Sequence, residues 1–66
     1  MTSIGQGRIE TIEVLVIAHI NHGFIGESLY EGILRDIPQD WFTLHTNAKM
    51  EIESVIKQTI ADEIRD

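Results

Sequence analysis

The chain has no cysteine, a single proline and only five lysines and arginines among its 66 residues. Without cysteine it can form no disulfide and no cysteine-ligated zinc or iron–sulfur site. The shortage of basic residues argues against direct binding to nucleic acid or to an anionic membrane, because both depend on clustered positive charge. The longest mostly apolar stretch, residues 12–20, is far shorter than the roughly 20 residues that cross a bilayer. We therefore expect a cytoplasmic protein with no cofactor.

Acidic and aliphatic residues dominate what is present. Eleven Asp and Glu give a formal charge of −6, and 42% of the residues are hydrophobic, a balance typical of a folded chain. A domain of about 60 residues buries only roughly 60% of its unfolded surface, so disulfides, a metal or a partner chain usually supplement its stability. We expect one small domain over residues 8–66, preceded by a flexible, polar arm at residues 1–7. We also expect a homo-oligomer.

The segment 8–20 is rich in β-branched residues and has no amphipathic helical face. From Val14 to Ala18 it is apolar on both faces, which is typical of a central strand covered on both sides. We predict a strand here, with a fully buried helix as the alternative.

The rest of the chain alternates between helical and extended patterns. The stretch Phe24–Ile37 predicts an amphipathic helix that ends before Pro38. Its apolar residues recur every four positions, at Ile25, Leu29, Ile33 and Ile37. Residues 40–45 (DWFTLH) suit a short second strand, and Asn47 is a plausible N-cap for a last helix to about Ile64.

The predicted order is therefore β-α-β-α, an α/β unit with two parallel strands joined by a crossover helix. A sheet of two strands leaves both edges open and is not stable alone, so we expect oligomerisation to complete it. The alternative fold is an all-α helical bundle, in which the first apolar segment is a buried helix.

In this α/β prediction, polar residues gather beyond the carboxyl ends of the strands, where ligands usually bind. They are His19, Asn21, His22 and Gly23 after the first strand, and His45 and Asn47 after the second. Together with the backbone N–H groups that open the next helix, they predict an anion site with His22 as its reactive group. The alternative is that they are ordinary turn residues. Zinc bound by the three histidines is a further alternative, but their spacing does not favour it, and we expect no metal.

The stretch VLVIAHINHGFIGESLYEGI resembles the start of a mannose-family EIIA domain of the bacterial phosphotransferase system. The resemblance covers about Val14 to Ile64 and implies that His22 and Gly23 match the phosphoacceptor histidine and its glycine. His19 lies close enough to be the counterpart as well. The second half of that family's sheet has no counterpart here, so the resemblance implies a half-domain that dimerises or acts as a regulator.

No catalytic constellation is recognisable, and we expect no enzyme. Trp41 and Phe42 are adjacent, so in a strand they cannot both face one core. We expect one of them at an interface, although partial burial under the last helix is an equal alternative. Glu27 and Glu31 lie on the solvent face of the first predicted helix and are further interface candidates.

These observations favour a small acidic, non-enzymatic protein-interaction module, a regulator or inhibitor of another protein. Its negative surface could imitate nucleic acid toward a basic partner, with candidate contacts Glu27, Glu31, Asp40, Glu51, Glu53, Asp62 and Glu63. The alternative function is an anion-binding or histidine-phosphoacceptor module at the predicted strand ends.

Overall fold

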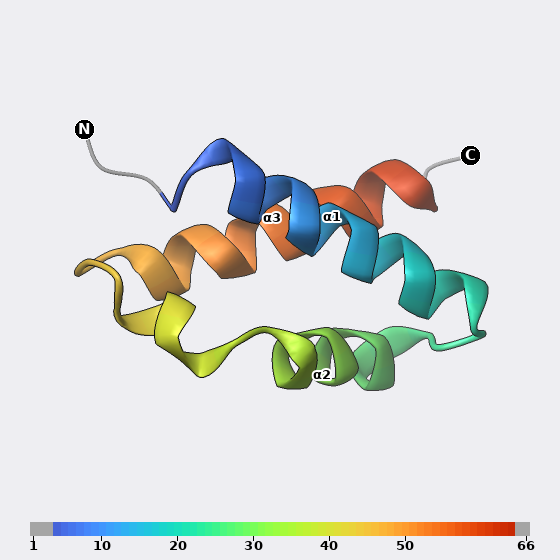
Figure 1. Cartoon of the computed structure of the whole chain (residues 1–66). Helices are drawn as coiled ribbons and strands as arrows, with labels where there is room; N and C mark the ends of the chain where they lie inside the picture. Colours follow the sequence, from blue (N-terminus) through green and yellow to red (C-terminus); the bar gives the residue numbers. More distant parts are fainter. Residues whose placement is uncertain (1–3, 65–66) are drawn as a thin grey trace.

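A computed structural model of the chain describes residues 4–64 and shows a helical fold (Figure 1). The elements are α1 (Gln6–Asn21), α2 (Gly26–Asp36), the short 3-10 helix η1 (Gln39–Thr43) and α3 (Ala48–Glu63). Helices hold 79% of the described residues, and none of these residues forms a strand. The predicted α/β fold is therefore wrong, and the chain has an all-helical arrangement instead.

The three α-helices form a small bundle around α1. In Figure 1, α1 and α3 run in the same direction across the view, and α2 runs back below them. Helix α1 packs against both α3 and α2, while η1 packs against α3. The C-terminal ends of α1 and α3 consequently lie at the same end of the molecule as the N-terminal end of α2.

The core is aliphatic, and each helix supplies residues that recur at intervals of four. Such residues lie on one face of a helix, so each helix turns a single apolar stripe toward the others. The buried hydrophobic residues are Ile4, Ile12, Val16, Leu29, Ile33, Ile37, Ala48, Ile52 and Ile56. The helices predicted for residues 24–37 and from Asn47 onward are confirmed as α2 and α3, and α2 ends before Pro38 as expected.

The first predicted strand, Val14–Ala18, lies inside helix α1. This segment is rich in apolar residues because helix α1 contacts two other helices, α2 and α3. Val16 is fully buried, while Val14 is 64% exposed on the outer face. Contacts with two neighbours therefore outweigh the preference of β-branched residues for strands.

The second predicted strand, residues 40–45, is mostly the 3-10 helix η1. The N–H of Trp41 donates to the carbonyl of Pro38 over 3.0 Å, and the hydroxyl of Thr43 donates to the carbonyl of Asp40 over 2.9 Å. Because residues 8–20 are helical, no strand was available to pair with this segment. Its backbone groups are satisfied locally instead.

The structure describes the expected N-terminal arm, residues 1–7, only from Ile4 onward. Residues 1–3 lie outside the described residues, but Ile4 is only 1% exposed and belongs to the core. Helix α1 already begins at Gln6. Residues 4–7 are thus part of the folded domain. None of the helices over residues 4–64 is both long and apolar enough to cross a membrane.

Candidate functional site

The six residues of the predicted anion site lie at opposite ends of the molecule. His19, Asn21, His22 and Gly23 surround the end of α1, whereas His45 and Asn47 precede α3. Figure 1 shows these two positions on opposite sides of the bundle. The prediction placed them together because parallel strands end at one edge of a sheet, and that sheet does not form.

The pair His22–Gly23 terminates helix α1. The N–H of Phe24 donates to the carbonyl of His19 (N···O 3.2 Å), and the N–H of Gly23 donates to the carbonyl of Ile20 (N···O 3.0 Å). Gly23 has a φ of +95°, the left-handed conformation that glycine adopts without strain. These features define a Schellman motif. The two amides are therefore engaged within the chain and are not directed at an anion.

Both ring nitrogens of His19 face hydrogen-bond acceptors. Nδ1 lies 2.9 Å from the carbonyl oxygen of Leu15, and Nε2 lies 3.0 Å from a carboxylate oxygen of Asp36. Both ring nitrogens are therefore engaged within the chain. The ring also lies against Phe24, with centroids 5.5 Å apart, and a Cβ on Gly32 would come within 3.1 Å of it. His19 is thus a packed, bridging residue between α1 and α2.

His45 has a different environment at the start of α3. The N–H of Asn47 donates to Nδ1 over 3.2 Å, so this nitrogen is an acceptor. Nε2 lies 2.9 Å from a carboxylate oxygen of Glu51, and both of these atoms are buried. The two atoms lie close together, but neither of them makes a hydrogen bond within the described residues. Asn47 occupies the N-cap position as expected but makes no side-chain cap bond.

Two further kinds of site would draw on polar side chains of residues 4–64, a metal site and a serine nucleophile. No group of three or more His, Asp or Glu side chains there is placed to hold a metal. Ser28 shares a cavity with His19 and Asp36. A serine nucleophile needs a ring nitrogen to accept its proton, and both nitrogens of His19 are engaged.

Trp41 and Phe42 are partly buried and pack against the core. The guanidinium carbon of Arg8 lies 5.4 Å from the centre of the Trp41 ring, and Arg8 Nη1 donates to the carbonyl of Ile4 over 3.2 Å. This cation–π contact covers the indole. We call this part of the molecule the closed end; its residues are Ile4, Arg8, Trp41, Phe42, His45 and Glu51.

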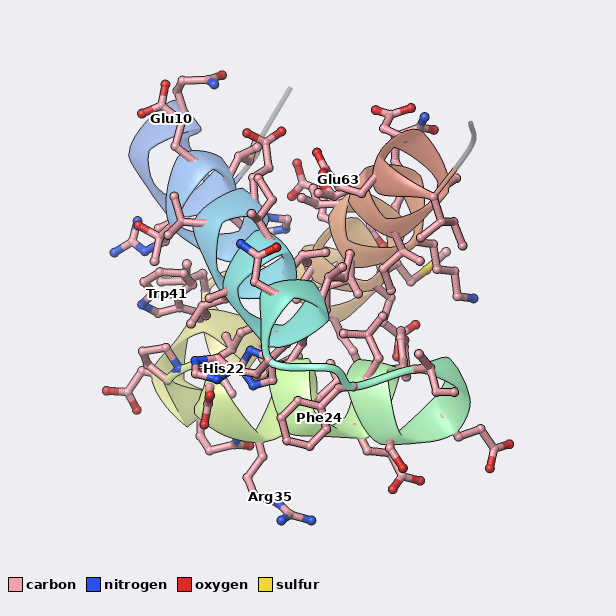
Figure 2. All side chains as sticks on the ribbon, turned by 90° about the vertical axis from the view of Figure 1, so that its right-hand side faces the viewer. Glu10, His22, Phe24, Arg35, Trp41 and Glu63 are labelled. Atoms are coloured by element: carbon pink, nitrogen blue, oxygen red, sulfur yellow. The ribbon has the colours of Figure 1, made fainter. Side chains whose placement is uncertain are left out.

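The opposite end, which we call the open end, carries an apolar groove that the sequence did not reveal. The end groove has a volume of about 240 Å³ and lies between the α1–α2 turn and the last turn of α3. Its lining residues are Ile20, Phe24, Ile25, Gly26, Leu29, Ile60 and Ile64. Figure 2 looks onto this end, with His22 and Phe24 on the turn.

Three large apolar side chains around the end groove are open to solvent. Ile25 is 79% exposed, Ile64 65% and Phe24 46%. Ile25 continues the four-residue repeat of the α2 core positions, so the sequence pattern places it inside. It lies outside because Gly26, with a φ of +61°, turns the chain just where α2 begins.

Among the described residues, the charged side chains next to the end groove are acidic; Arg65, which follows Ile64 in the sequence, lies outside the described residues. No lysine or arginine occurs in residues 17–34 or 58–64, whereas these segments contain Glu27, Glu31, Asp62 and Glu63. The candidate interface residues Glu27 and Glu31 are both exposed on α2. Asp40, Glu51 and Glu53 lie elsewhere, with Glu51 paired to His45, so the seven acidic candidates do not share one environment.

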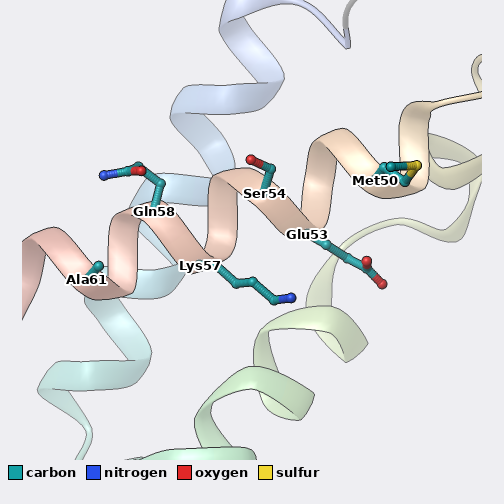
Figure 3. A pocket seen from close by; sticks show the side chains of 6 residues that line it. All are labelled: Met50, Glu53, Ser54, Lys57, Gln58 and Ala61. Carbon is teal, nitrogen blue, oxygen red and sulfur yellow. The ribbon is translucent and has the colours of Figure 1, made fainter.

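A further hollow follows the outer side of α3. It is lined by Met50, Glu53, Ser54, Lys57, Gln58 and Ala61, all from this one helix (Figure 3). All the side chains that line this hollow come from one helix, so no second element adds a group to it. We therefore regard the end groove as the candidate functional site.

A comparison of this chain with protein-family models, curated proteins and solved structures found no match. The resemblance to a mannose-family EIIA domain stays a prediction. The segment that it aligns with the family's first strand is helix α1, and the matched His22–Gly23 pair is the cap of that helix.

Proposed function

We propose that this chain is a small acidic, non-enzymatic protein-interaction module that binds another protein through its open end. One observation carries the proposal: Phe24, Ile25 and Ile64 surround an apolar groove while being 46–79% exposed. Contiguous apolar surface of this kind on a small folded chain marks an interaction site. Binding there would make the chain a regulator or inhibitor of its partner.

The size of the end groove favours a protein partner over a small molecule. Sites for small molecules usually enclose about 300–1,000 Å³ and carry a few convergent polar groups. The end groove has about 240 Å³, and isoleucine, leucine, phenylalanine and glycine line it. A single side chain of another protein fits such a groove better than a whole metabolite.

Self-association is a second part of the proposal and uses a different surface. On the outer face of α1, Val14 is 64% and Ile17 is 37% exposed, so this helix carries apolar surface outside its buried stripe. A helix of that kind is usually covered by neighbours. Light scattering over a tenfold range of concentration should give a dimer or larger oligomer for the wild type. It should give a monomer for Val14→Glu/Ile17→Glu. A monomeric wild type would refute this second part.

The main proposal is tested by capture experiments with a matched pair of variants. Ile25→Ser/Ile64→Ser removes apolar surface at the end groove, whereas Met50→Ser removes a side chain of similar exposure, 70%, on α3 outside it. These positions are exposed, so circular dichroism should show all variants folded. Proteins retained from a cell extract by the wild type and Met50→Ser should be lost with Ile25→Ser/Ile64→Ser. Equal retention by all three would contradict the proposal.

A further inference from the structure

We infer that the end groove receives a bulky apolar side chain from a positively charged amphipathic helix of another protein. This inference rests on the proposed function and adds the chemistry of the partner. It depends on the shape of the end groove and on the charges around it.

The end groove has a covered floor and an exposed rim. Leu29 is buried, and Ile20 and Ile60 are partly buried against the core. Phe24, Ile25 and Ile64 form the exposed part. An inserted aliphatic or aromatic side chain would therefore contact preformed apolar walls from both the α1–α2 turn and α3. Deep, largely desolvated anchors of this kind supply most of the affinity in protein interfaces.

The acidic residues next to the end groove favour a cationic partner. Glu27 follows the lining residue Gly26, and Glu63 precedes the lining residue Ile64. Both carboxylates belong to exposed residues, and no ion pair joins either of them to another side chain in residues 4–64. Lysine or arginine on the partner would pair with them without displacing an existing contact.

The helix ends add to the negative potential. Helices α1 and α3 both terminate at the open end, and each C-terminal end carries a partial negative charge equivalent to about half an electron. Only α2 presents a positive N-terminal end there, and Glu27 in its first turn opposes it. The helix dipoles and the acidic side chains thus both favour a positively charged partner.

The same charges disfavour two other occupants. A second copy of the chain docked end to end would bring the same acidic residues together, and like charges across an interface oppose binding. An anionic lipid surface would be repelled as well. An amphipathic helix fits the observations because its apolar anchors and flanking charges lie on adjoining faces.

The inference is tested with synthetic helical peptides and the full chain. The first probe carries leucine on one face and lysine on the other. A second replaces lysine with glutamate, and a third replaces leucine with serine. We expect the Leu/Lys peptide to bind at least about tenfold more tightly than either of the others, as measured by fluorescence anisotropy. Because the flanking contacts are exposed, added salt should weaken its binding.

Variants of the chain locate the interaction. Ile25→Ser/Ile64→Ser should weaken binding of the Leu/Lys peptide by about tenfold or more, and Met50→Ser should leave it unchanged. Glu27→Gln/Glu63→Gln should weaken it by about three- to tenfold at low salt, while Glu10→Gln, outside the end groove, should have no effect.

The possible outcomes separate this inference from the proposed function. Equal binding of the Leu/Glu peptide, or equal binding by Ile25→Ser/Ile64→Ser, would overturn the inference about the partner. If the Leu/Lys peptide fails while the capture experiment still depends on Ile25 and Ile64, the partner chemistry is wrong and the interaction module stands. If neither experiment depends on those residues, both proposals fail.

Discussion

The two ends of this bundle are built from similar residue types but treat them in opposite ways. At the closed end, Trp41 and Phe42 are packed against the core, and Arg8 covers the indole ring. The carboxylate of Glu51 faces His45 there. At the open end, apolar side chains remain up to 79% exposed, and no ion pair joins Glu27 or Glu63 to another side chain within residues 4–64. The closed end therefore holds packed contacts, whereas the open end leaves exposed the apolar surface on which the proposed binding depends.

The connecting segments explain the difference. A 3-10 helix and the residues before α1 cover the closed end, where Ile4 is almost fully buried. The open end has only the short turn between α1 and α2, with Gly23 and Gly26 at positive φ. That turn is too short to fold over the last turn of α3, so the apolar side chains around it stay exposed.

The largest expected contrast is in stability. Ile37, near the closed end, is 1% exposed, and Ile37→Ala should lower the free energy of unfolding by about 2–5 kcal/mol. Ile25 is 79% exposed, and Ile25→Ala should change that free energy by less than about 0.5 kcal/mol. Urea unfolding measures both. Equal losses would show that the open end belongs to the core.

The next largest expected effect is the loss of stability when the Schellman motif at Gly23 is disturbed. Gly23→Ala places a Cβ at a φ of +95° and should destabilise the chain by about 1–2 kcal/mol. Gly7→Ala is the control, because Gly7 lies in α1, has no positive φ and has open space around its Cα. This change should stabilise the chain by up to about 1 kcal/mol. Thermal or urea unfolding distinguishes the two; a neutral Gly23→Ala would mean that the turn has another conformation.

The ring nitrogens of the two histidines should differ in their hydrogen-bond roles. Both nitrogens of His19 face acceptors, whereas Nδ1 of His45 accepts from the N–H of Asn47. Nitrogen chemical shifts of the two rings, recorded at one pH, test this difference. The same pattern of ring-nitrogen shifts for both residues would contradict it.

The smallest effect concerns Tyr30. Burial, and secondly the negative charge of Glu53, raise the pKa of Tyr30 above its usual 10.0. The folded chain therefore holds the phenol proton more tightly than the unfolded chain. The corresponding stabilisation is complete below pH 10 and is lost as the pH rises through the raised pKa.

The Glu53→Gln variant should lower the pKa of Tyr30 only part of the way, because burial is the larger cause. Ultraviolet absorbance reports the titration of this single tyrosine. Glu10→Gln is the matched control and should leave the titration as it is. An unchanged curve for Glu53→Gln would remove Glu53 as a cause.

The sequence predicted α2 and α3 because each carries one apolar stripe and has a clear boundary, Pro38 for α2 and Asn47 for α3. For residues 8–20 it favoured a strand, with a buried helix only as the alternative, because the β-branched, apolar run Val14–Ala18 has the composition of a covered strand.

The candidate site was less accessible to sequence reasoning. The exposure of Ile25 depends on the backbone angle at Gly26, and the cover over Trp41 depends on Arg8, more than thirty residues away. Neither leaves a local pattern. The sequence shows an excess of acidic residues. It does not show that some of them lie beside an apolar groove.

The most direct test of the central claim maps where a cationic helix binds. Amide spectra of the full chain would be recorded during addition of the Leu/Lys peptide. We predict that the largest shifts fall on residues 24–27 and 60–64, with little change for residues 41–51 at the closed end. Shifts centred on residues 41–51, or none at any peptide concentration, would contradict the assignment of the open end as the binding surface.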